Sequence, residues 1–352
     1  MKNKISITLK PFTFLFSSSK TNSLFILFFL LPQIFMLFLT KSWANLIIIG
    51  LTTAASLCAE FSEKLYKKDK TEYHYILAVI QGLLTGLFLP ASYSLVSAFF
   101  ITFFVIVTAR FFIGGFADNW INIPCLTVCV CWLTGAAFFP DYQLTHEILL
   151  SKNPALALIQ NGTFPMNALD SRITASLNRT VFSFFGVSIP DGYISLFWDS
   201  SAVIPAFRFN FITLVTSIIL ISLDVVKALI PAVFILVYSL LIYFVSPYFY
   251  DSTMHGDLLL GLCTSGLLTS TLFLLQFAGT TPLTLTGKLV YAILSGISAF
   301  LIIGAGTSPA GAVFTILCMN VISLLIQHIE HIVELHRTKK ILYARIKEME
   351  EA

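Results

Sequence analysis

Three cysteines that stand close together in the sequence are the residues best suited to bind a metal. Cys125 and Cys129 are four residues apart, which places both thiols on one face of a helix, and Cys131 follows two residues later. A structural metal site usually needs four ligands, and no fourth candidate stands nearby. We therefore interpret these thiols as small apolar groups that pack inside the fold. A metal or cluster site is the less favoured alternative, so no metal site is predicted.

Charged residues are scarce within the apolar segments and map to their ends. Glu60, Arg110, Asp224, Lys227 and Lys288 all follow this rule. A proton relay across a membrane normally needs carboxylates at mid-depth. The sequence therefore disfavours a self-sufficient proton relay, and we predict no catalytic residue.

The polar residues that approach the interior flank glycines and prolines, and these interruptions repeat. A segment that starts at Pro90 reaches Gly114 after 24 residues, and a segment that starts at Pro282 reaches Gly304 after 22 residues. Backbone that is freed by glycine or proline inside a membrane must be buried in protein or face a cavity. The candidate pathway residues are the positions at these interruptions: Gly114, Gly115, Asn119, Asn122, Thr280, Thr281, Pro282, Thr284 and Pro309.

The composition places these residues in a membrane protein. Of 352 residues, 57% are hydrophobic and only 11% are charged, and the mean hydropathy is +0.87. Soluble domains are usually about one quarter charged. Ten segments are long and apolar enough to be transmembrane helices; they lie near 23–40, 44–60, 74–89, 91–110, 121–139, 203–222, 228–246, 258–276, 289–306 and 310–327.

The basic residues set the orientation of these segments. With the N-terminus inside, sixteen of the 21 Lys and Arg residues fall on the cytoplasmic side, where short loops of membrane proteins collect positive charge. Both termini are then cytoplasmic. The sequence therefore divides into a five-helix membrane repeat at 1–140, an extracytoplasmic loop at 141–202, a second five-helix repeat at 203–327 and a cytoplasmic amphipathic helix at 328–352.

The C-terminal helix and the repeat each leave a choice open. The helix at 328–352 is either a solvated tail, stabilised by charge pairs four residues apart, or a docking surface for a partner. Because five segments separate the two copies of the glycine and proline pattern, the copies have opposite orientations in the membrane. Many transporters build a midplane pathway from such an inverted repeat. The alternative is a chance resemblance of the two copies, because glycine and proline are common at the ends of membrane helices.

Three strings of residues resemble segments of a known family. Gly114-Gly115-Phe116-Ala117-Asp118-Asn119-Trp120-Ile121-Asn122 resembles the GGxxxNxxNP segment of the RnfD/NqrB family. Thr280-Thr281-Pro282-Leu283-Thr284 with Gly287-Lys288 resembles that family's TTPxT..GK segment, and the run from Pro309 to Asn320 resembles its PxGxxFxxLxMN segment. The chain departs from the pattern at Trp120 and Ile123, which replace prolines, and at Ala310, where an acidic residue is common.

The resemblance, which is strongest to the RnfD branch, implies both a fold and a function. The fold is an all-α polytopic membrane protein with about ten transmembrane helices, in a five-plus-five inverted repeat similar to urea transporters. The function is that of a membrane subunit of an ion-translocating electron-transport complex, coupled to Na⁺ or H⁺, in a bacterial plasma membrane. The implied partners are other membrane and redox subunits of an Rnf-type complex and a flavin transferase. Nothing indicates a nucleic-acid partner. A urea-transporter-like channel without a redox cofactor is the alternative.

The resemblance also implies a flavin site in the extracytoplasmic loop. Family members carry an S/T-G-A-T motif there, and this chain has Ser171-Arg172-Ile173-Thr174. We expect FMN to be attached to Thr174 through a phosphodiester, on an exposed hydroxyl of flexible backbone, with Ser171 and Arg172 beside it. The guanidinium of Arg172 suits the flavin phosphate. Whether a second, non-covalent flavin binds is left open.

Overall fold

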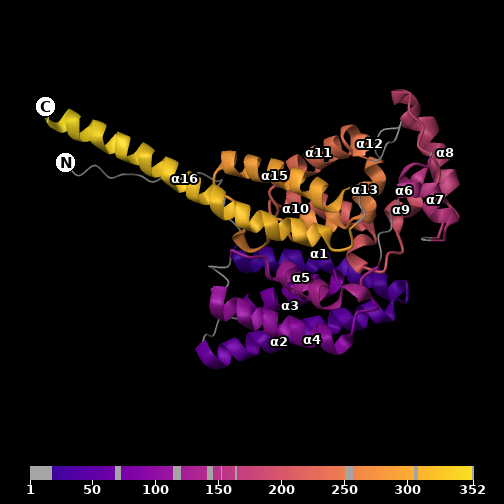
Figure 1. Cartoon of the computed structure of the whole chain (residues 1–352), viewed down its shortest axis with the longest axis horizontal. Coiled ribbons are helices and arrows are strands. Elements are labelled where there is room, and N and C mark those ends of the chain that lie inside the picture. Colours follow the sequence, from indigo (N-terminus) through magenta and orange to yellow (C-terminus); the bar gives the residue numbers. More distant parts are fainter. Residues whose placement is uncertain are drawn as a thin grey trace, which may run out of the picture.

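The computed structural model describes residues 18–67, 73–113, 120–140, 146–151, 153–162, 165–249, 257–304 and 308–350. All regular secondary structure in these ranges is helical, which confirms the predicted all-α class. Figure 1 shows the N-terminal half (indigo to magenta) beside the C-terminal half (orange to yellow), with a group of short helices at one end of both. We call this group, residues 146–198, the cap.

The N-terminal half consists of five helices that follow the first five apolar segments. Ser18 caps the first of them by accepting a hydrogen bond from the amide of Thr21 at 3.2 Å. The fourth ends in one π-helical turn, η1, which contains Arg110. The bounds are α1 Ser19–Leu39, α2 Trp43–Lys67, α3 Tyr73–Leu87, α4 Leu95–Thr108, η1 Ala109–Ile113, α5 Ile123–Gly135 and η2 Ala136–Phe138.

The cap and the C-terminal half contain shorter elements between the long helices. The cap comprises α6 His146–Leu149, α7 Pro154–Gln160, α8 Asp170–Thr180, η3 Phe182–Phe185 and α9 Tyr193–Trp198. The C-terminal half comprises η4 Pro205–Phe207, α10 Asn210–Ser222, α11 Leu229–Phe244, α12 Ser246–Phe249, α13 Leu258–Thr264, α14 Leu267–Phe273, η5 Phe277–Gly279, α15 Leu285–Ile303 and α16 Gly311–Glu350.

Six described helices are long and apolar enough to cross a membrane, and three more are apolar but shorter. The chain is therefore a multi-pass membrane protein. The segment at 258–276, which the sequence predicted as one continuous span, is broken into α13 and α14, so that prediction is wrong. At the break, Gly266 has a φ of +67°, and the ring of Phe207 fills the space that a Cβ atom would need.

Polar groups from neighbouring elements satisfy the backbone around this break. The Asn210 side chain donates to the carbonyl of Cys263 at 2.9 Å, and the Thr269 hydroxyl donates to the carbonyl of Ala206 at 2.7 Å. Irregular backbone at membrane depth is tolerated where protein groups satisfy it in this way.

Several helix contacts of the first half have counterparts in the second half. Helix α2 packs on α4 as α11 packs on α15, and α4 contacts α5 as α15 contacts α16. Helix α1 contacts α3 as α10 contacts α14. The halves meet where α1 contacts α10 and where α5 contacts α16. The opposite orientation of the two copies remains a prediction.

Helix α16 continues without a break from Gly311 to Glu350, so the amphipathic tail extends the last span as the sequence predicted. In Figure 1 its C-terminal part leaves the bundle at the end opposite the cap. The cap and the end of α16 therefore lie at opposite ends of the bundle.

Candidate functional site

The predicted pathway residue Asn122 joins the two halves of the bundle. Its side chain is completely buried; it caps α5 by accepting from the amide of Cys125 at 3.2 Å, and it donates to the carbonyl of Leu274 at 2.8 Å. The side-chain amide of Asn320 on α16, oriented to satisfy both of its neighbours, accepts from the backbone amide of Asn122 at 2.8 Å. Gly114, Gly115 and Asn119 lie outside the described residues.

Pathway residues of the second half form hydrogen bonds with α16 where this helix leaves the bundle. Thr284 caps α15 by accepting from the amide of Gly287 at 3.0 Å, and its hydroxyl donates to the carboxylate of Glu330. Gln327 donates to the carbonyl of Thr281 at 3.2 Å. A Cβ atom at Gly287 would overlap the Glu330 carboxylate, so this glycine leaves room for the contact.

The remaining predicted positions of this half have packing roles. Thr280 is buried and donates to the carbonyl of Phe277 at 3.0 Å. Pro282 is buried, and Pro309 is half-buried just before α16 begins. Asn122, Thr281 and Thr284 therefore each contact α16. Their partners Asn320, Gln327 and Glu330 share one face of that helix, at spacings of seven and three residues.

The cap is built around one buried carboxylate at the start of α8. Asp170 accepts from the amide of Gly192 at 2.9 Å, and from the amide and hydroxyl of Ser195 at 2.6 and 2.5 Å. The Thr174 hydroxyl donates to the same carboxylate at 3.2 Å. Burial alone would raise the pKa of Asp170, but the hydrogen bonds from Ser195, Gly192 and Thr174 outweigh it and the pKa is lowered.

Thr174 therefore does not present the exposed hydroxyl that we expected from the sequence. Thr174 lies on a regular helix. Its side chain is only 3% exposed, because it faces Asp170 and α9. Ser171 and Arg172 are exposed. On the exposed face of α8, Arg172 shares a helical stripe with Ser176 and Arg179, at spacings of four and three residues.

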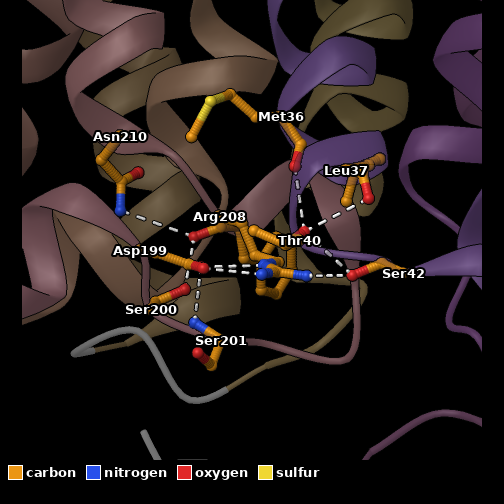
Figure 2. A network of polar contacts seen from close by, with 10 residues as sticks. Met36, Leu37, Thr40, Ser42, Asp199, Ser200, Ser201, Arg208 and Asn210 are labelled. Carbon is orange, nitrogen blue, oxygen red and sulfur yellow. Dashed lines mark hydrogen bonds and ion pairs between the residues drawn. The ribbon is translucent and has the colours of Figure 1, made fainter. Parts of the chain in front are cut away.

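An arginine at the entry of the C-terminal half connects the residue that follows the cap with the N-terminal half, as Figure 2 shows. Arg208 forms a two-pronged ion pair with Asp199, at 2.8 Å from Nε and 2.6 Å from Nη2. Its Nη1 donates to the hydroxyl of Ser42, in the turn between α1 and α2, at 2.9 Å. A paired guanidinium of this geometry fixes orientation as well as distance. A second contact connects the cap to the C-terminal half: the hydroxyl of Tyr193 donates a hydrogen bond to the carboxylate of Asp257 at the start of α13.

Three residues in and beside this network have left-handed backbone without being glycine. They are Lys41, Ser201 and Phe209, with φ values of 55°, 49° and 53°. Such conformations persist only where surrounding contacts enforce them. Here the amide of Ser201 donates to Asp199 at 2.8 Å, and the guanidinium of Arg208 lies over the Phe209 ring, 4.8 Å from its centroid.

The sequence analysis missed a buried cluster of charged side chains at the end of the bundle opposite the cap. Glu60 and Arg110 are 1% and 2% exposed and form an ion pair. Arg110 also pairs with Glu63 at 3.0 Å and donates to Gln81 at 3.3 Å. His74 lies 3.8 Å from the Glu60 carboxylate. We call these five side chains the Arg110 cluster. The sequence signal was the pair of glutamates three residues apart near the end of an apolar segment.

The cysteines form no metal site among the residues that the structure describes. No group of three or more His, Cys, Asp or Glu side chains there could hold a metal ion. Cys125, Cys129 and Cys131 are buried and free, and they pack in the main hydrophobic core.

A comparison with protein families identifies one match over nearly the whole chain. The model of the NQR2, RnfD, RnfE family matches residues 6–334, which include both halves, the cap and the start of the extended part of α16. A search of curated proteins found no match.

Proposed function

Because the chain belongs to the NQR2, RnfD, RnfE family, and is thus a membrane subunit of an Rnf- or Nqr-type complex, we propose that it carries flavin and relays electrons in a reaction coupled to Na⁺ or H⁺ movement. The family match over both halves carries this proposal. The complex resides in a bacterial plasma membrane, and its other membrane and redox subunits supply and accept the electrons. A bound flavin would supply the one- and two-electron chemistry, while the chain would hold and orient it.

We place the covalent FMN on α8 of the cap. The resemblance implies Thr174 as the attachment residue, with Ser171 and Arg172 beside it. The hydroxyl of Thr174 does not fit this role in the folded cap, because it is buried against Asp170. Attachment there would require transfer before α8 packs against α9. The folded cap instead exposes the hydroxyl of Ser176, which Arg172 and Arg179 flank on the same face.

Flavin fluorescence of the denatured chain tests this placement after co-expression with a flavin transferase. We expect a fluorescent wild-type band in a denaturing gel. If transfer precedes folding, Thr174→Ala is dark and Ser176→Ala is bright; if transfer follows folding, the result is reversed. Ser171→Ala removes an exposed hydroxyl of the same helix and serves as the matched control, which stays bright. Equal fluorescence in all three variants would contradict a flavin on α8.

A cavity between the two halves provides a place for a second, non-covalent flavin. Its volume is about 420 Å³, and it lies between α1, α3 and the segment that follows α14. Asn22 and Ser23 line one side, and Phe273 and Phe277 line the other. Such a mixed lining suits a planar ring with an apolar face and a polar edge. The measurement is flavin released by acid from the purified chain, which we expect to fall when Ser23 is replaced by Phe.

The proposed orientation puts the cap outside the cell and both termini in the cytoplasm. The structure supports part of it, because the cap and the end of α16 lie at opposite ends of the bundle. In a variant without native cysteines, we expect a cysteine at Ser151 to react with an impermeant thiol reagent in intact cells. A cysteine at Arg337 should react only in inverted vesicles. The reverse pattern would overturn the orientation and remove the flavin site from the compartment proposed for it.

A further inference from the structure

The Arg110 cluster lies toward the end of α2 that is farther from the cap. Helix α2 starts at Trp43, beside the turn that Arg208 holds near the cap. Glu60 follows 17 residues later, which is about 26 Å along the helix at about 1.5 Å per residue. The hydrocarbon core of a bilayer is about 30 Å thick. The cluster therefore lies near the face of the hydrocarbon core that is opposite the cap, and Glu60 and Arg110 are nearly completely buried there. Buried ionisable side chains in a membrane protein are costly, and they commonly mark ion or proton paths.

The cluster is assembled from three helices around one guanidinium. Glu60 and Glu63 come from α2, His74 and Gln81 from α3, and Arg110 from η1. The π-helical turn of η1 matters because such turns are rare and recur at functional sites. Ala59, Ile106, Ala109 and Ile123 form a small buried apolar cluster, in which Ala59 and Ala109 are the chain neighbours of Glu60 and Arg110.

Exposure falls stepwise from the surface into the cluster. The His74 side chain is 26% exposed, whereas those of Glu60 and Arg110 are each 1% exposed. Lys64 is a further charged group at this surface, and its amine lies over the Tyr75 ring, 3.6 Å from the centroid. An imidazole between water and a buried carboxylate can pass a proton inward, because both of its nitrogens can carry one.

We propose that Glu60 is a proton-binding site, loaded through His74 from the membrane side opposite the cap. In this step the imidazolium of His74 gives its Nδ1 proton to Oε1 of Glu60, either directly after a small approach of the two groups or across one bridging water. The imidazole becomes neutral, the carboxylate becomes a neutral acid, and His74 takes its next proton from water. Arg110 then keeps Glu63 and Gln81 as partners, so its charge remains compensated.

This inference deepens the proposed function, on which it rests, by naming where a coupling proton would be held. It has a readout that needs no electron transfer. In infrared difference spectra of the purified full chain between about pH 8 and about pH 5, a range that spans histidine protonation, we expect a band from a desolvated carboxylic acid. Glu60→Gln should remove this band. Glu63→Gln should retain it, as should Asp224→Asn, which removes an exposed carboxylate paired with Lys227 in the other half.

Turnover of the whole complex in inverted membrane vesicles gives the second readout. We expect Glu60→Gln to keep electron transfer and lose proton uptake, and His74→Gln to slow proton uptake by about tenfold or more. A carboxylic band that survives in Glu60→Gln, or proton uptake unchanged in that variant, overturns the inference and leaves the proposed function standing. A wild-type complex without electron transfer refutes the proposed function instead, and the infrared band then still decides whether Glu60 binds a proton.

Discussion

Replacing Asp170 with alanine is expected to unfold the cap while the membrane bundle stays intact. The substitution removes the acceptor of four hydrogen bonds and leaves the buried amides of Gly192 and Ser195 without a partner. Each such amide costs about 1–3 kcal/mol, so the expected loss of cap stability is about 2–6 kcal/mol. Hydrogen exchange should rise across α8 and α9 and remain unchanged in α2 and α15.

An exposed carboxylate of the same cap provides the control for this change. Asp191 is exposed, and Asp191→Ala removes the same charge without breaking a buried network. We expect it to change hydrogen exchange only locally. Equal loss of protection in both variants would show that the charge, and not the buried acceptor, stabilises the cap.

The lowered pKa of Asp170 also predicts acid sensitivity of the cap. A carboxyl whose pKa is lower in the folded than in the unfolded state stabilises the fold above its unfolded pKa of about 3.9, and this contribution is lost as the pH falls through the folded pKa. Hydrogen exchange of α8 should therefore rise below about pH 4. The same measurement on Asp170→Asn should show less protection at neutral pH and little further loss on acidification.

Replacing Gly266 with alanine is expected to destabilise the C-terminal half by about 2–5 kcal/mol. The new methyl group would overlap the Phe207 ring, and overpacking costs about 1–3 kcal/mol. The left-handed backbone at Gly266 adds about 1–2 kcal/mol for a residue with a side chain. The measurement is the thermal unfolding temperature of the detergent-solubilised chain.

Gly186 separates the two causes, because its φ of +66° matches that of Gly266 while no atom lies within 4 Å of the position that a methyl group would take there. Gly186→Ala should therefore cost about 1–2 kcal/mol, from backbone strain alone. Adding Phe207→Leu to Gly266→Ala should recover part of the lost stability. No recovery in the double variant would mean that the clash with Phe207 is not the cause.

The hydrophobic pattern predicted most of the helices because long apolar runs have few other solutions in a membrane. It did not predict the break at Gly266, since the run from Thr264 to Gly266 is compatible with a helix when read alone. The Phe207 ring, which packs against the open side of Gly266 at this break, stands 59 residues away in the sequence. Long-range packing of this kind leaves no local signal.

The candidate sites were predictable only in part, for a related reason. The sequence identified the segments that hold Asn122 and Thr284, but it could not show that both contact α16. The sequence placed Glu60 and Arg110 at helix ends, where charged side chains are usually solvated. A single segment does not show how deeply a side chain lies in the bundle or which helices pack beside it. Helical periodicity places Thr174 and Ser176 on different faces of α8. Only the packing of Asp170 against α9 decides which of these two faces is buried.

The length of α16 gives the molecule a lever arm. Its 40 residues extend about 60 Å, which is about twice the hydrocarbon thickness of a bilayer. About 30 Å of helix therefore extends past the hydrocarbon thickness, and Gln327 and Glu330, which contact Thr281 and Thr284, are the point about which it would pivot. A tilt of about 10° at that point displaces the tip by about 5 Å, given the rise per residue of an α-helix. By this geometry a tilt of α16, which contacts Asn122 of the N-terminal half through Asn320, would move the tip much farther than the residues at which the two halves meet.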